Sequence, residues 1–168
     1  MEFAKADFDL FDREVFAFKQ IKDIYPPETI QRLKEDYQMS WQKWKHIQMT
    51  VATNVSADLQ PKVESWTNGW NLRSHFWCAY RNEAHPNQNA CLAALINQKQ
   101  YQVYFMFQHY KSGQRSGSLA AYNDLRWQIE EWSKDKNLAD YYIWPQVEHE
   151  LEDHCPLAVY LSEPQKQR

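Results

Sequence analysis

Residues 90–110, ACLAALINQKQYQVYFMFQHY, decide the fold of this 168-residue chain. Two apolar runs, 90–96 and 101–110, flank the short polar connection 97–100, whose length is typical of a β-hairpin. The second run alternates, and one of its two faces carries Tyr101, Val103, Phe105, Phe107 and His109. The two runs therefore predict a pair of antiparallel strands.

A third strand is predicted before this hairpin, at residues 72–81, where the apolar period is also two. The face that suits a protein core carries Leu72, Phe76, Cys78 and Tyr80. The other face carries Arg73, His75, Trp77, Ala79 and Arg81. The polar loop 83–89 connects this strand to the hairpin, so the three strands are expected to form an antiparallel meander.

Two amphipathic helices are predicted ahead of the strands. In residues 8–22 the apolar positions recur at intervals of three and four, at Phe8, Phe11, Val15, Phe18 and Ile21. Pro26 ends that helix, and Pro27 suits the first position of the next one. The apolar face of the second helix consists of Ile30, Leu33, Tyr37, Trp41 and Trp44. Aromatic residues at this spacing indicate core packing more than a ligand platform.

Shorter patterns predict the remaining elements. Ser56 has the character of a helix N-cap, with Leu59, Val63 and Trp66 on the inward face of the helix that follows.

After the strands, a helix is predicted from Leu119 to Asn137, with Ser116 or Ser118 as its N-cap. Residues 156–161 are expected to form a last strand.

This order of helices, strands, then a helix and a strand predicts the α+β class. We expect an antiparallel sheet of about four strands with helices packed on one face, in a single domain over residues 1–168 with a frayed tail at 162–168. The pattern shows no repeat, linker or domain boundary.

The composition excludes several kinds of protein. Eight Trp, ten Tyr and eight Phe stand against three Gly, which excludes a low-complexity chain and any cofactor site that needs a glycine-rich turn. The sequence therefore predicts no cofactor. Three cysteines, Cys78, Cys91 and Cys155, form no C-x-x-C pair and are expected to be small core residues of a reducing compartment.

Charge and hydropathy bear on partners and location. The formal net charge of −3 disfavours nucleic acid as a partner, although it leaves a local basic patch open. The chain shows neither a secretory leader nor an apolar run of the roughly 20 residues that a membrane helix needs. These features predict a cytoplasmic protein with no membrane partner.

The first candidate site is the turn after the third strand, residues 109–118, HYKSGQRSGS. Backbone N–H groups at the start of the following helix attract anions, and Lys111 and Arg115 add positive charge. The spacing is not that of a P-loop, because the lysine precedes the glycines. The alternative is an ordinary solvated loop before a capped helix.

The second candidate site is the polar face of residues 72–81. Arg73, His75 and Arg81 share that face, and His85 follows in the loop. If they lie beside His109, they could bind a phosphate or carboxylate or transfer a proton. The alternative is the water-facing side of a half-exposed sheet.

A third pattern, HELEDH at residues 149–154, is similar to a zinc-protease motif. Its histidines are five residues apart, however, so on a helix they would lie roughly 140° apart. A solvated acidic turn is the alternative, and the sequence predicts no metal.

Three stretches, FDREVFAFKQIK at 11–22, RSHFWCAYR at 73–81 and HYKS at 109–112, resemble a small bacterial family. Some of its members carry the label glucose-6-phosphate 1-dehydrogenase family protein. That label implies a nicotinamide dinucleotide and a sugar phosphate. The chain lacks the glycine fingerprint, the alternating βα order and the length that such an enzyme needs, so the resemblance implies only a compact bacterial cytoplasmic protein.

Two hypotheses share one set of residues. The first is a binding domain for a small anionic or phosphorylated ligand, and the second is a hydrolase of a phosphoester or nucleic acid with His75 or His109 as general base. The predicted ligand-binding residues are Arg73, His75, Arg81, His109, Lys111, Ser112 and Arg115. A third hypothesis is a protein-interaction module with exposed aromatic residues such as Trp70 or Tyr142, and a homodimer is compatible with all three.

Overall fold

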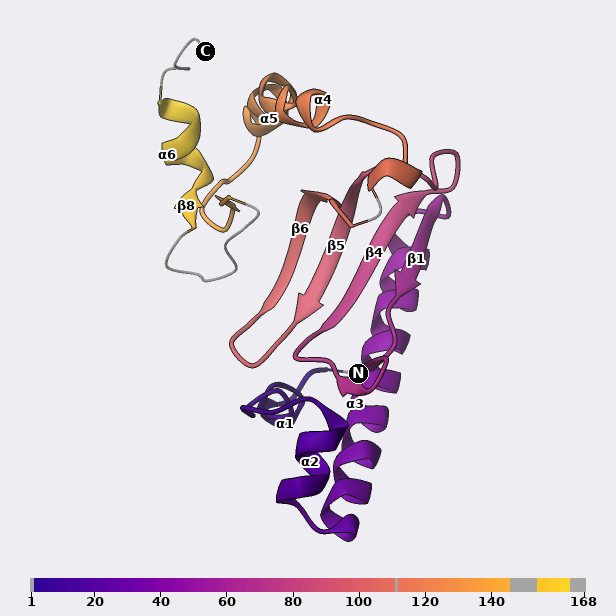
Figure 1. Ribbon diagram of the computed structural model, residues 1–168. Coiled ribbons are helices and arrows are strands. Elements are labelled where there is room, and N and C mark those ends of the chain that lie inside the picture. The colour runs from indigo at the N-terminus through magenta and orange to yellow at the C-terminus, as the bar shows by residue number, and fades with distance from the viewer. Residues whose placement is uncertain (1, 111, 146–153, 164–168) are drawn as a thin grey trace. The chain divides into compact units, whose positions relative to one another are not determined.

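The structure is a computed structural model that describes residues 2–110, 112–145 and 154–163. These residues group into two compact units, Met1–Ser116 and Gly117–Arg168. The single domain expected from the sequence stays a prediction, and each unit is described by itself below. Figure 1 shows the elements of both units.

The first unit is built on an antiparallel sheet of four strands in the order β1-β4-β5-β6. The strands are β1 (Leu59–Val63), β4 (Phe76–Asn82), β5 (Ala90–Ile96) and β6 (Tyr101–Phe107). Strands β4, β5 and β6 form the predicted meander, although β4 begins at Phe76 and not at residue 72, and β6 ends at Phe107 and not at residue 110. The α+β class with a four-stranded antiparallel sheet is confirmed.

A single long helix, α3 (Pro27–Val55), lies along one face of this sheet (Figure 1). Pro27 occupies the first turn, where a missing N–H group costs nothing, and the extended backbone of Pro26 stops the preceding helix. The predicted start is therefore confirmed. The predicted apolar face is also confirmed, since Ile30, Tyr37 and Trp44 are buried.

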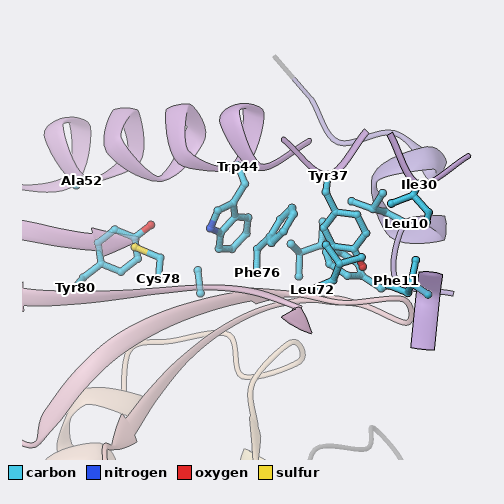
Figure 2. Close-up of a cluster of buried hydrophobic side chains, with 13 residues drawn as sticks. Leu10, Phe11, Ile30, Tyr37, Trp44, Ala52, Leu72, Phe76, Cys78 and Tyr80 are labelled. Carbon is cyan, nitrogen blue, oxygen red and sulfur yellow. The ribbon is translucent and has the colours of Figure 1, made fainter. Parts of the chain in front are cut away.

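The core of the first unit lies between α3 and β4 (Figure 2). Phe76 of β4 is 1% exposed, and its ring centroid lies 6.0 Å from Tyr37, 6.5 Å from Trp44 and 5.0 Å from Phe11. Tyr37 and Phe11 meet this ring edge-on, which is a favoured aromatic geometry. Loss of one such side chain from a close-packed core typically costs about 3–5 kcal/mol.

The N-terminal segment forms two short helices where the sequence predicts one helix over residues 8–22. Helix α1 spans Lys5–Asp9 and helix α2 spans Phe18–Ile24. Between them the chain turns at Phe11, which still reaches the core. The predicted inward side chains are thus correct, but the continuous helix is wrong.

A small hairpin explains this interruption. Strands β2 (Thr67–Asn68) and β3 (Asn71–Leu72) pair with each other, and Gly69 takes the left-handed φ of 60° that their tight turn requires. The carbonyl of Phe16 accepts a hydrogen bond of 2.8 Å from the N–H of Leu72. The segment before α2 therefore pairs with the hairpin and cannot be helical.

The predicted helix after Ser56 is also wrong, because residues 59–63 form the edge strand β1. Ser56 ends α3 and caps the turn that follows, since its hydroxyl accepts a hydrogen bond from Asp58 N–H. Backbone bonds from Glu64 to Trp77 and from Glu83 to Asp58 place the hydrogen-bonded positions of β1 at even numbers. Pro61 therefore stands where an N–H would point away from the sheet, a position that an edge strand tolerates.

Asp7 holds the N-terminal segment against α3. Its carboxylate accepts hydrogen bonds from Ala4 N–H (2.8 Å), Ser40 Oγ (2.6 Å) and Lys43 Nζ (2.5 Å). Burial alone would raise the pKa of Asp7, but the bonds from Lys43, Ser40 and Ala4 lower it below its usual range. The folded state therefore prefers the ionised carboxylate.

The second unit contains three short helices and a two-stranded pairing among its described residues. Its elements are α4 (Leu119–Asn123), α5 (Arg126–Ser133), β7 (Tyr142–Ile143), β8 (Cys155–Pro156) and α6 (Leu157–Ser162). Arg126 joins α5 to α6, because its guanidinium donates to the carbonyl of Glu163 (2.8 Å) and lies 4.6 Å from the ring centroid of Tyr160.

Two predictions for this unit need correction. The helix expected from Leu119 to Asn137 is divided at Asp124, although Ser118 is the N-cap, since its hydroxyl accepts from Ala121 N–H. The strand expected at 156–161 is helix α6, because only Cys155 and Pro156 pair with β7 before the chain turns helical.

Replacement of Asp7 by Asn tests the attachment of the N-terminal segment. We expect Asp7→Asn to lower the free energy of unfolding at pH 7 by about 2 kcal/mol, because it leaves Lys43 without its ion-pair partner. A carboxylate whose pKa is lowered in the folded state stabilises the protein above its unfolded pKa of about 3.9 and loses that effect as the pH falls through the folded pKa. Urea unfolding between pH 2 and pH 7 should therefore show the difference between wild type and variant shrinking toward low pH.

The matched control is Asp9→Asn, which removes the exposed Lys5–Asp9 pair of the same helix. Exposed pairs contribute about 0.2–1 kcal/mol, so this variant should stay close to wild type. Equal effects of the two substitutions would contradict the role given to Asp7.

Candidate functional site

The candidate site lies on the face of β4 that points away from α3. Phe76 and Tyr80 point into the core, so the alternation of the strand sends Trp77, Ala79 and Arg81 to the opposite face. That face is not open to water as the alternative interpretation held, because all three residues are at most 9% exposed. A buried cation therefore stands at the end of β4.

Arg81 is held in place by hydrogen bonds to uncharged groups. Its Nε donates to the carbonyl of Gln88 at 3.1 Å, and its Nη2 donates to Oε1 of Gln108. Gln108 is itself 8% exposed, so this contact is also buried. The guanidinium is oriented by two acceptors that do not neutralise its charge.

Backbone hydrogen bonds between two loops place Arg115 within electrostatic range of Arg81. Ser116 N–H donates to the carbonyl of Asn87, and the carbonyl of Ser116 accepts from Asn89 N–H, each at 2.9 Å. Asn89 in turn accepts from Gln108 N–H at 2.9 Å. The loop that follows β6 is thereby fixed against the loop that precedes β5, and Arg115 lies on it directly before Ser116.

The two guanidinium groups interact electrostatically, and neither has a counterion among the residues that the structure describes. Burial is the main cause that lowers the pKa of Arg81; the Cys91 thiol opposes this effect, and the positive charge of Arg115 adds to it. In the described part of the chain, no carboxylate forms an ion pair with Arg81 or Arg115. The buried Nε of Arg115 also has no hydrogen-bond partner there. A buried cation with a second cation in electrostatic range, and with no acid partner among the described residues, is suited to receive an anion.

Cys91 lies beside this pair on β5 and is 3% exposed. Burial raises the pKa of its thiol, and the nearby charges of Arg81 and Arg115 oppose that effect. Because the net change is upward, the group is a neutral thiol at physiological pH and is not activated as a nucleophile.

The structure separates Arg73 and His75 from Arg81. The chain between His75 and Arg81 is extended, so at about 3.3 Å per residue these two lie roughly 20 Å apart along the strand. Arg73 already has an acid partner, since its Nη1 lies 2.7 Å from Oε2 of Glu64. Of the predicted binding residues, the structure therefore brings together Arg81 and Arg115.

The remaining predicted residues are placed as follows. His109 follows Gln108 in the chain, is exposed, and packs its ring against Phe107 with centroids 5.1 Å apart. Lys111 lies outside the described residues, and Ser112 begins the short 3-10 helix η1 (Ser112–Gln114). Their binding roles stay predictions.

The zinc-protease-like pattern falls largely outside the described residues, at 149–153. His154 is described, and its ring stacks on Trp144 with centroids 4.1 Å apart. Among the residues that the structure describes, no cluster of three or more His, Cys, Asp or Glu side chains could hold a metal.

Sequence reasoning missed Gln88 and Gln108, which orient Arg81. The position of Gln108 could have been inferred from the sequence. Gln108 follows β6 with the same alternation as Gln102, Tyr104 and Met106, so it lies on the face of the sheet to which Arg81 points. Gln88 acts through its backbone carbonyl, so its side chain carries no signal.

The fold and the site define an α+β protein whose four-stranded antiparallel sheet, backed by one long helix, carries a buried arginine, Arg81, and a half-buried one, Arg115. A protein-family model matches residues 3–168, and the chain belongs to that bacterial family. A Haemophilus influenzae protein described as an uncharacterised protein is 31% identical over 146 residues, which are 86% of this chain and 68% of the relative. No solved structure matches the chain. These comparisons do not support the dehydrogenase label.

No described helix is both long enough and apolar enough to cross a membrane.

Replacements of Gln108 test whether the arginine pair lacks a counterion. We expect Gln108→Glu to raise the free energy of unfolding at pH 7 by about 1–2 kcal/mol, because a carboxylate there would pair with the buried guanidinium of Arg81. Gln108→Leu should lower it by about 1–3 kcal/mol, because it leaves a buried guanidinium N–H without an acceptor. Urea unfolding at pH 7 measures both. A destabilising effect of Gln108→Glu as large as that of Gln108→Leu would show that the charge is already neutralised.

The environment of the cysteines predicts unequal thiol reactivity. Cys78 and Cys91 are buried, and burial raises the pKa of Cys78 to about 12, whereas Cys155 is half-buried. With a thiol reagent at pH 8, one thiol per native chain should react quickly, and Cys155→Ser should remove that fast phase. A fast phase that survives in Cys155→Ser would contradict the burial of the other two thiols.

Proposed function

We propose that the protein binds a small anion, the phosphate group of a small phosphorylated compound, at Arg81 and Arg115. The observation that carries this proposal is that the buried Arg81, fixed by Gln88 and Gln108 and within electrostatic range of Arg115, has no carboxylate partner in the described residues. Most buried cations in proteins have an acid partner, so an uncompensated pair supports an external anion.

The donors that remain on these groups match a tetrahedral oxyanion. A guanidinium has five N–H donors, and Arg81 commits one each to Gln88 and Gln108. The buried Nε of Arg115 adds a donor without a partner. Arg115 is more exposed than Arg81, so the ligand would meet Arg115 first. Two planar forks can bind several phosphate oxygens at once, which a single ammonium group cannot do.

We propose that the protein binds this ligand and does not hydrolyse it. A hydrolase would need a general base within hydrogen-bond reach of the reacting group. His75 is roughly 20 Å from Arg81 along the strand, and the ring of His109 packs on Phe107. Neither observation favours the hydrolase.

We also propose a cytoplasmic location. Its support is the presence of three cysteines without a disulfide among the described residues, of which Cys78 and Cys91 are buried thiols.

Thermal unfolding in the presence of anions tests the binding proposal. At constant ionic strength, replacing chloride by inorganic phosphate should raise the melting temperature of the wild type. A ligand at one hundred times its Kd adds about 2.7 kcal/mol, which moves the melting temperature of a chain of this size by several degrees. Arg115→Ala should lose most of this shift, because Arg115 is the more accessible of the two arginines. Parallel scans with sulfate and acetate separate a tetrahedral oxyanion from a carboxylate.

The matched control is Lys62→Ala, which removes an exposed cation from β1 and should keep the full shift. Lys111→Ala extends the test to the predicted residue outside the described part of the chain. The same phosphate shift in Arg115→Ala and Lys62→Ala would overturn the proposal, since it would show a general salt effect.

A further inference from the structure

The tip of the hairpin formed by β2 and β3 carries an asparagine followed by a glycine, Asn68 and Gly69. No other asparagine of the chain precedes a glycine. Both residues are exposed, and the adjacent Trp70 is 87% exposed. Asparagine is a thermally labile residue, and glycine hinders attack on a neighbouring side chain least, because it has no Cβ. The hairpin tip therefore combines two residues that favour a reaction of the chain with itself.

The backbone nitrogen of Gly69 is the nucleophile for such a reaction. Asn68 and Asn71 are register partners that close the turn, so Gly69 lies outside the ladder. Its N–H group donates no hydrogen bond within the described part of the chain. Apart from the two neighbours of Gly69 in the chain, no described heavy atom lies within 4 Å of the position that a Cβ on Gly69 would take. The Gly69 nitrogen is therefore neither hydrogen-bonded nor sterically shielded there.

Asn71 lies in the same hairpin and is also exposed, but the amide that follows it is different. The N–H group of Leu72 donates a hydrogen bond of 2.8 Å to the carbonyl of Phe16, and the Leu72 side chain is 2% exposed. Attack by this nitrogen would break that bond and move a side chain out of the core. Asn71 is therefore a matched comparison for Asn68 within one hairpin.

We propose that Asn68 is a site of spontaneous covalent modification, namely deamidation through a succinimide. The Gly69 nitrogen forms a bond to Cγ of Asn68, and the side-chain nitrogen leaves as ammonia, taking up a proton in place of the one that Gly69 loses. Water then opens the ring at one of its two carbonyls, which yields aspartate or isoaspartate. The reaction occurs within the chain and consumes only water, so it depends on no partner and is independent of the anion site.

Modification at this position bears on the fold because the hairpin anchors the start of α2. The N–H group of Phe18 donates to the carbonyl of Trp70 at 3.0 Å, and Ala17 forms an antiparallel bridge with Asn71. Isoaspartate adds one carbon to the main chain before Gly69, so it shifts the register that places these groups. Aspartate adds the same charge but leaves the main chain unchanged. The isoaspartate form therefore holds α2 less firmly than the aspartate form.

Incubation of the full chain at pH 8 and 37 °C, followed by peptide mapping with mass spectrometry, tests this proposal. Asn68 should convert at least roughly tenfold faster than Asn71, because only Asn68 precedes an unhindered nitrogen. The rate at Asn68 should rise with pH, since the Gly69 nitrogen attacks in its deprotonated form. Asn68→Gln should stop conversion at this position, because the longer side chain closes its ring more slowly. Asn71→Gln is the matched control and should leave the conversion of Asn68 unchanged.

Ion exchange separates the deamidated chains, because each carries one more negative charge. The isoaspartate fraction should melt a few degrees below Asn68→Asp, which has the same charge and an unaltered main chain. Equal melting temperatures would contradict the effect on α2. The same incubation in urea measures the rate in the unfolded chain. The proposal would be overturned if native Asn68 converted no faster than Asn71, or more than about a hundredfold more slowly than in urea.

Discussion

The packing of α3 on Phe76 is the contact on which the rest of the first unit depends. Tyr37 and Trp44 are two turns apart on the helix, and both rings meet the ring of Phe76 on β4. Because side chains alternate along a strand, this contact decides the orientation of every residue of β4. As a consequence, Arg81 points to the face of the sheet opposite α3. The orientation of β4 therefore determines both which side chains form the core and where the candidate site lies.

The same register explains why a charged residue can be buried there. A guanidinium at the end of β4 needs acceptors, and the chain supplies a backbone carbonyl from Gln88 and an amide oxygen from Gln108. These contacts compensate lost hydrogen bonds with water but not the lost solvation of the charge. The loops around residues 87–89 and 116 then add a second cation, Arg115, where an acid would have been stabilising. Among the described residues no carboxylate forms an ion pair with Arg115, and this is the observation behind the anion that we propose there.

Much of the fold could be predicted because its signals are local. The hairpin of β5 and β6 follows from alternation and a short polar connection, and the start of α3 follows from Pro27. The errors arise where tertiary pairing overrides a local pattern. Residues 10–17 have helical spacing, but the backbone of Phe16 pairs with Leu72, some 55 residues away. Residues 59–63 follow a serine that suits a helix start, yet they complete the sheet beside β4.

The residues of the candidate site could be predicted from the sequence, but their arrangement in space could not. The sequence indicates that Arg81 and Arg115 belong to the polar face of one strand and to the loop after another, but it does not show that these features meet. Their meeting depends on backbone bonds between loops about 30 residues apart, which leave no trace in side-chain pattern. The alternation that grouped Arg73 with Arg81 assumed one strand over residues 72–81, but β4 begins at Phe76, so it does not place Arg73 on the face of Arg81.

The most direct test of the central claim is an NMR titration of the arginine Nε–H resonances with inorganic phosphate. The account predicts that the resonances of Arg81 and Arg115 shift together and saturate, while that of Arg126, which pairs with Glu130 in the second unit, stays in place. Equal, non-saturating shifts of all three, or no shift of Arg81 and Arg115 at phosphate concentrations that stabilise the protein, would contradict it.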